Sequence, residues 1–174
     1  MFKNYFNIKR KSIVIIMILS IFQISGLNLE AKQKNQNKKK LSISESNLKE
    51  GREFLEENKK KPGIVVRESG LQYQVLKKGT GLQPRGVDEV EVHYHGTLIN
   101  GKVFDSSVDR GKTIRFPVRG VIRGWQEALM LMSEGSKWKI FVPSHIAYGE
   151  RSAGRLIGPN KTLIFVVELI KVIQ

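Results

Sequence analysis

The chain has 174 residues and a formal net charge of +14, and 40% of its residues are hydrophobic. That length suits one domain of ordinary size plus an extension. It contains no cysteine, which excludes disulfides, thiolate catalysis, cysteine-bound zinc and the anchoring cysteine of a bacterial lipoprotein. Residues 1–62 hold 14 Lys and Arg against 6 Glu, so most of the excess charge lies where core residues are fewest. We interpret the basic part of this segment as a solvated tether rather than a surface that binds nucleic acid or anionic membrane.

Residues 1–31 have the pattern of an export signal. Four basic residues precede an apolar run over 13–24 that has only two polar interruptions. This run is short for a membrane span, which needs about 20 apolar residues. We therefore predict a signal peptide that is cleaved after Ala31, and export to the periplasm or the outer cell surface. An uncleaved inner-membrane anchor, in which residues 13–29 tether the chain to the membrane, is the alternative, and a buried core helix is the third interpretation.

The segment after the signal divides into a linker and a helix. Residues 32–41 are rich in Lys, Asn and Gln, and we predict a disordered basic linker because they can bury little apolar surface. Residues 42–62 are predicted to form a helix, since Ser42 or Ser44 can cap it and Glu45, three residues beyond Ser42, suits the capping box. Pro62 marks its end. Its apolar stripe is thin, so we expect this helix to lie against the following domain or a partner.

After Gly63 the sequence pattern changes from helical to strand periodicity. Apolar and polar residues alternate over 71–76 and over 90–95, which predicts strands. Asn100-Gly101 is the dipeptide favoured in tight hairpin turns. We therefore predict one α+β domain over 63–174, in which a curved antiparallel sheet wraps over one short α-helix. Its other predicted elements are strands over 113–118, 137–142 and 162–172 and an amphipathic helix over 125–132.

Five motifs occur in order along this domain. They are Val92–Gly96, Phe104–Ser107, Val121–Trp125, Ile146–Gly149 and Leu163–Leu169. Together they resemble the signature of the FKBP-type peptidyl-prolyl cis-trans isomerases. The residues leading into them, Glu53–Lys61 and Ser69–Tyr73, resemble the macrophage infectivity potentiator-like subfamily of exported bacterial proteins. The resemblance implies an FKBP-like fold and rotation about X–Pro bonds with no metal and no cofactor.

The resemblance also implies a set of functional residues. Asp105, Tyr148 and Tyr94 are the expected catalytic residues: Asp105 as a carboxylate beside the twisted amide, Tyr148 as a hydrogen-bond donor and Tyr94 within reach of Asp105. The backbone N–H of Ile122 is the second expected donor to the substrate. Trp125 resembles the floor on which a proline ring rests, with aromatic walls and an aliphatic rim around it. The expected substrate-binding residues are Phe104, Ile114, Phe116, Val121, Ile122, Trp125, Leu156 and Phe165.

Each of these residues also has a simpler interpretation when it is taken singly. Trp125 and Phe165 fit ordinary core packing, and Asp105 fits a turn or a helix cap. The joint order and spacing of the motifs favours the pocket. His93 and His95 alternate on one strand face, but no third ligand stands nearby, so we interpret them as an exposed pair rather than a metal site.

The first functional hypothesis is therefore an exported isomerase that assists protein folding by accelerating X–Pro rotation. Its expected partners are unfolded or Pro-containing polypeptides, and FK506-like macrolides as inhibitors. The alternative is a non-catalytic chaperone or surface-interaction module that holds Pro-containing segments in the same pocket. A nucleic-acid-binding β-barrel is the third hypothesis, and the lack of exposed aromatic residues interleaved with Lys and Arg argues against it. A homodimer through the N-terminal helix is left open.

Overall fold

The computed structural model describes residues 3–174, with side chains from Leu29 onward except Ala31. The chain divides into two compact units between Ser42 and Ile43. Most side chains of the signal segment predicted over 1–31 lie outside the described residues, so its cleavage stays a prediction. Within the part of the chain that is described, no helix combines the length and the apolar character needed to cross a membrane.

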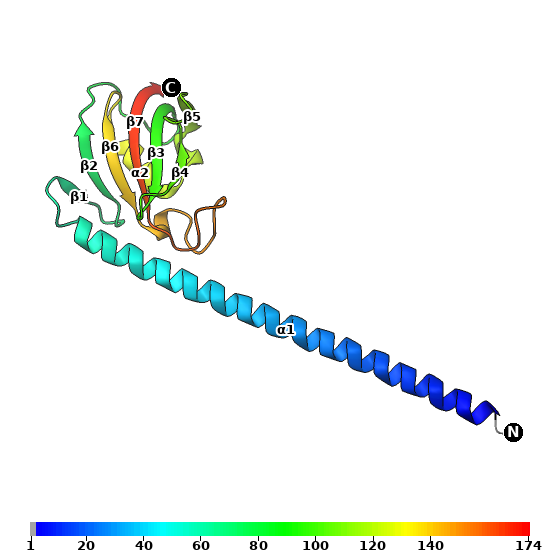
Figure 1. The fold of residues 1–174 in the computed structure, drawn as a ribbon. Helices are drawn as coiled ribbons and strands as arrows, with labels where there is room; N and C mark the ends of the chain where they lie inside the picture. Colours follow the sequence, from blue (N-terminus) through cyan, green and yellow to red (C-terminus); the bar gives the residue numbers. More distant parts are fainter. Residues whose placement is uncertain (1–2) are drawn as a thin grey trace. The chain divides into compact units, whose positions relative to one another are not determined.

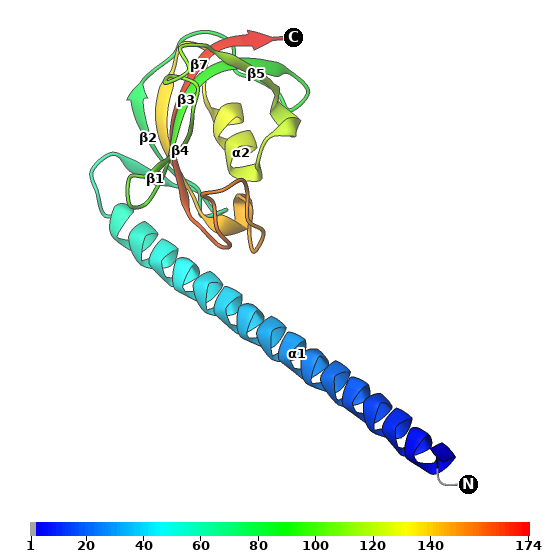
Figure 2. The ribbon, with the colours of Figure 1, turned by 45° about the vertical axis from the view of Figure 1, so that its right-hand side comes forward.

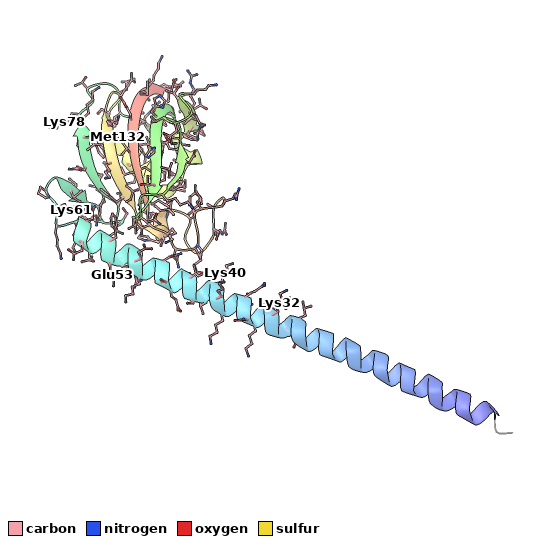
Figure 3. The ribbon with its side chains drawn as sticks, in the orientation of Figure 1. Lys32, Lys40, Glu53, Lys61, Lys78 and Met132 are labelled. Atoms are coloured by element: carbon pink, nitrogen blue, oxygen red, sulfur yellow. The ribbon has the colours of Figure 1, made fainter. Side chains whose placement is uncertain are left out.

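The first element is helix α1 (Lys3–Asn58), and it corrects two expectations. Residues 32–41 are helical in the structure, where the sequence predicted disorder. The prediction of disorder rested on the small apolar surface that this segment can bury. Lys and Gln nevertheless favour helix locally, and no Gly or Pro interrupts the segment. Lys32 and Lys40 project from this helix (Figure 3). The helix also ends at Asn58, before the predicted end at Pro62, and a turn connects it to the first strand.

Residues 43–174, which we call the sheet unit, contain one antiparallel sheet of seven strands (Figure 1). The strand order is β1-β2-β6-β7-β3-β4, and β5 pairs with β3 beyond this path. The long central strands β3 and β7 pair with each other over nearly their whole length. The strands are β1 (Ile64–Val66), β2 (Gln72–Lys77), β3 (Glu89–Leu98), β4 (Val103–Ser106), β5 (Ile114–Pro117), β6 (Lys137–Val142) and β7 (Leu163–Ile173).

The sheet curves around helix α2 (Arg123–Leu131), which lies on its concave side (Figure 2). Alternate residues of β3 are buried, so one face of this strand points toward α2. The apolar stripe of α2 meets that face through Trp125, Ala128 and Leu129, which are all buried, and Met132 follows it into the core. The predicted α+β class, with an antiparallel sheet wrapped over one short helix, is confirmed.

The turns follow the predicted chemistry. Gly101 has a positive φ of 80°, and its N–H donates to the Leu98 carbonyl at 3.0 Å, which closes the turn between β3 and β4. Pro117 ends β5, which pairs with β3 alone among the described strands, as expected for proline at a sheet edge. Two 3₁₀ turns, η1 (Val118–Gly120) and η2 (Ser144–Ile146), precede α2 and follow β6.

The last turns of α1 are part of the sheet unit. The rings of Phe54 and Phe141 have their centroids 6.0 Å apart. Asn58 donates from Nδ2 to Gln72 Oε1 at 2.9 Å, and Gln72 donates in return from Nε2 to the Leu55 carbonyl at 2.9 Å. The expectation that this helix lies against the following domain is confirmed. The compact unit therefore begins before residue 63, where the sequence placed the domain boundary.

Candidate functional site

A pocket of about 1260 Å³ opens between α2, the concave face of the sheet and the loop that precedes β7. All eleven residues that the sequence singled out line it, although they come from six separate segments. The backbone brings them together because β3, β4, β5 and β7 are neighbours in the sheet and α2 lies across them. The remaining lining residues are Arg110, Gly120, Ala153, Gly154, Arg155 and Ile157.

The floor of the pocket is the indole of Trp125. Trp125 lies near the start of α2, where its backbone N–H donates to the Ile122 carbonyl at 2.9 Å, and only 4% of the residue is exposed. Three rings meet the indole edge-to-face, with centroids 5.4 Å away for Tyr94, 6.2 Å for Phe116 and 5.2 Å for Phe165. Such tilted arrangements are the favoured geometry for aromatic pairs. The floor is therefore rigid and apolar, which suits a small saturated ring.

The second aromatic wall is fixed by the close approach of two strands. Phe104 of β4 meets Phe165 of β7 edge-to-face with centroids 5.4 Å apart. Both rings lie against Gly96 of β3, which is buried and pairs with Phe165 across the sheet. Glycine leaves room here that a side chain would fill. The position of these rings thus depends on the absence of a Cβ in the strand behind them.

One polar cluster lies at the edge of this apolar pocket. The Tyr94 hydroxyl donates to Asp105 Oδ2, and Arg110 donates from Nη1 to Asp105 Oδ1. Arg110 also donates from Nη2 to the Tyr94 oxygen at 3.1 Å, so the three side chains close a ring of hydrogen bonds. Arg110 did not emerge from sequence reasoning. Its only sequence signal is a basic residue in the loop after the Phe-Asp-Ser-Ser motif, which many solvated loops share.

The cluster fixes the charge of its two acidic groups. Burial alone would raise the pKa of the Asp105 carboxyl, but the hydrogen bonds from Tyr94 and Arg110 and the charge of Arg110 together hold that pKa below its usual range. Burial, and then the hydrogen bond to Asp105, raises the pKa of the Tyr94 hydroxyl above its usual value. At neutral pH the pocket edge therefore carries an ionised carboxylate, a neutral phenol and a guanidinium.

Among the residues that line the pocket, the Ile122 N–H, the Tyr148 hydroxyl and the buried Trp125 Nε1 have no hydrogen-bond partner in the described part of the chain. The N–H of Ile122, at the start of α2, has no acceptor there, while the Ile122 carbonyl is used by the helix. Gln126 donates from Nε2 to the Val121 carbonyl at 2.7 Å, which holds the backbone on either side of this N–H. Tyr148 lines the same pocket and is 42% exposed.

The histidine pair of β3 lies outside the pocket lining. His93 and His95 are each within 3.0 Å of a serine hydroxyl, Ser107 and Ser106, on the strand face opposite Tyr94. In the described ranges no group of three or more His, Cys, Asp or Glu side chains could hold a metal ion.

Comparison with known proteins identifies the class to which this fold and pocket belong. The family model described as FKBP-type peptidyl-prolyl cis-trans isomerase matches residues 81–170. A second model, for the domain amino terminal to such isomerases, matches residues 21–75. The chain belongs to the FKBP-type peptidyl-prolyl cis-trans isomerases.

Individual relatives indicate the subfamily of FKBP-type isomerases that the chain resembles. The outer membrane protein MIP of Legionella longbeachae is 52% identical over 155 residues, which is 89% of this chain and 64% of that protein. The FKBP-type 22 kDa isomerase of Escherichia coli is 55% identical over 124 residues, 71% of this chain and 60% of that protein. This chain thus spans less than two thirds of the length of these relatives. The resemblance to the macrophage infectivity potentiator-like subfamily is confirmed by relatives that carry that name.

Solved structures agree with this assignment. The crystal structure of FkpA from Escherichia coli superposes with a TM-score of 0.81 at 38% identity and covers 87% of this chain and 71% of that chain. A peptidyl-prolyl cis-trans isomerase from Pseudomonas syringae gives a TM-score of 0.70 at 41% identity, over 75% of this chain and 96% of that chain.

Proposed function

We propose that this chain is a peptidyl-prolyl cis-trans isomerase that acts on Pro-containing segments of unfolded polypeptides. One observation carries the proposal: an aromatic cage over Trp125 stands beside two unpartnered donors, the Ile122 N–H and the Tyr148 hydroxyl. The cage can hold a proline ring by its apolar surface. The donors can hold the carbonyls on either side of the bond that rotates.

The mechanism follows from the electronic structure of the amide. The barrier to rotation is about 20 kcal/mol because twisting breaks amide resonance. The planar amide is dipolar and is stabilised by water, so a dry, apolar pocket favours the twisted state relative to the planar one. Donors fixed in advance need no reorganisation when the bond turns. In our proposal Trp125 and its neighbouring rings exclude water, and Ile122 and Tyr148 orient the chain.

The cluster of Asp105, Tyr94 and Arg110 supplies a fixed field at the edge of this pocket. In our proposal the Asp105 carboxylate, which lines the pocket, lies beside the carbonyl carbon of the twisting amide. Arg110 and Tyr94 keep the carboxylate in one rotamer, because each takes one of its two oxygens. We assign Asp105 and Tyr148 as catalytic residues and Tyr94 as a catalytic residue that also holds Asp105. The other predicted residues of the pocket form the binding surface.

Line-shape or exchange NMR on a short Ala-Pro peptide tests this function directly. Catalysis is expected to appear as exchange between the cis and trans signals at catalytic protein concentration, and an FK506-like macrolide is expected to suppress it by occupying the cage over Trp125. Peptide binding without faster exchange would instead support the non-catalytic chaperone. Absence of both would refute the proposal.

We also propose that the chain works outside the cytoplasm. The basic segment followed by the apolar run at 13–24 supports export, and one relative is named an outer membrane protein. The exposed apolar residues Leu29 and Ile43 are two heptads apart on α1 and share one face, which a second copy of the helix would cover. Cell fractionation with N-terminal sequencing tests export and distinguishes a cleaved signal from a retained tether over 13–29. Light scattering of the purified chain tests the homodimer.

A further inference from the structure

One wall of the pocket is an irregular segment, residues 147–162, which we call the pocket loop. It contributes Tyr148 and the lining residues 153–157. Within the loop, the regular pairing is a single bridge between Ala153 and Ile157. The base of the loop is closed by one backbone bond, from the Asn160 N–H to the Gly149 carbonyl at 2.7 Å. A segment with so little internal pairing needs outside contacts to keep one shape.

Those contacts come from α1. Asn47 of the helix donates from Nδ2 to the Pro159 carbonyl at 2.8 Å, across 112 residues of sequence. Asn47 is 8% exposed and Pro159 is buried, so this bond is shielded from water. Asn160 donates from Nδ2 to Ser44 Oγ at 2.8 Å. The loop lies beside this part of α1 in Figures 1 and 2. A third bond runs from Lys161 Nζ of the loop to Glu50 Oε2 of the helix at 2.9 Å, so three bonds tie the helix to the base of the loop.

The backbone at the tie point is held in an uncommon conformation. Asn160 has a positive φ of 55°, the left-handed region that few residues other than glycine adopt. Its side chain bonds to Ser44, and its backbone N–H bonds to Gly149, the residue after Tyr148. The helix thus supports the same residue that closes the loop at Gly149, the residue after Tyr148.

Close packing fixes the distance between the helix and the loop. A Cβ placed on Gly51 would lie 2.4 Å from Oγ1 of Thr162, which is buried. Only glycine at this position lets the helix approach the end of the loop so closely. Glu53, by contrast, projects from the face of α1 turned away from the sheet (Figure 3). The contacts are confined to one face of the helix, over 44–51.

From these contacts we infer that α1 residues Ser44, Asn47 and Gly51 are positioning residues for the substrate pocket: they hold the pocket loop, and with it Tyr148 and Leu156, in the geometry that binds substrate. This inference rests on the proposed isomerase function and deepens it. It makes the N-terminal helix part of the site that recognises the Pro-containing segment, although no described side chain of α1 lines the pocket.

The test uses the full chain with Asn47→Ala and Ser44→Ala, and Lys49→Ala as the matched control on the exposed side of the same helix. Alanine favours helix, so none of these changes should unwind α1. We expect faster amide hydrogen exchange at 150–157 in both test variants, with exchange in β3 and β7 unchanged. We also expect KM for a Pro peptide to rise by about two- to tenfold, the range of one net hydrogen bond, with a smaller change in kcat. Lys49→Ala should match the parent chain in every readout.

Two outcomes would overturn the inference. One is unchanged loop exchange and unchanged KM in both test variants. The other is a uniform rise in exchange across the whole sheet with activity following the folded fraction, since the contacts would then serve only global stability. If the unaltered chain shows no catalysis, the proposed function fails, while loop exchange in the same variants still decides whether the helix positions the loop.

Discussion

Replacing Gly96 by alanine should displace the aromatic rings that form one wall of the pocket. A Cβ at this position would lie 2.7 Å from Phe104 Cζ and 3.1 Å from Phe165 Cδ1. Ordinary carbon contacts lie near 3.5 Å or beyond, so the Phe104 ring must move by roughly 0.8 Å. Overpacking of this kind costs about 1–3 kcal/mol of unfolding free energy. Both displaced rings form the pocket wall, so we expect kcat/KM to fall by about 10- to 100-fold.

Thermal unfolding and peptide exchange measured on the same samples check this prediction. Each kcal/mol should lower Tm by about 3–5 °C for a unit of this size. Gly86→Ala is the matched control, because the nearest atom to its added Cβ would be Arg119 Nε at 3.5 Å, an ordinary contact. It should leave Tm unchanged or slightly raised. A Gly96→Ala protein with the Tm and kcat/KM of the parent chain would refute the reasoning that glycine sets the position of the two rings.

Three further outcomes are expected. Tyr148→Phe should lower kcat/KM by about two- to tenfold with little change in Tm, since the residue is 42% exposed. Trp125→Ala should cost about 3–5 kcal/mol of unfolding free energy and abolish peptide binding. Equal destabilisation by both variants would make Tyr148 a structural residue. Because the folded pKa of Asp105 is depressed, its contribution to folding stability is complete above the unfolded pKa of about 3.8 and is lost as pH falls through the lower folded pKa. Asp105 therefore stays ionised at neutral pH, and activity should be flat from about pH 6 to 8. A bell-shaped profile near neutrality would indicate proton transfer instead. A fragment of residues 43–174 should fold and keep the activity of the full chain, because the compact unit begins at Ile43; circular dichroism and peptide exchange check this, and an unfolded fragment would contradict it.

The local pattern of the sequence was sufficient for most elements of the sheet unit. Alternation over 71–76 and 90–95 predicted β2 and β3, and Asn100-Gly101 predicted the turn after β3. These predictions succeed because strand burial and turn dihedrals depend on residues that are adjacent in sequence. The helical spacing from Trp125 to Met132 likewise gave α2, whose buried stripe is local in origin. The order of the motifs likewise predicted residues that all line one pocket.

Tertiary structure alone decided the contacts between distant segments. Arg110 has no periodic signal, and only the pairing of β3 with β4 places it against Tyr94 and Asp105. The bond from Asn47 to Pro159 joins segments 112 residues apart, and polar residues on a helix give no sign of which carbonyl they will meet. The sequence by itself determined which faces are buried and which turns form, since these depend on neighbouring residues. Which polar groups meet across the fold depended on how the sheet curves and where the helices lie, and no local pattern encodes that.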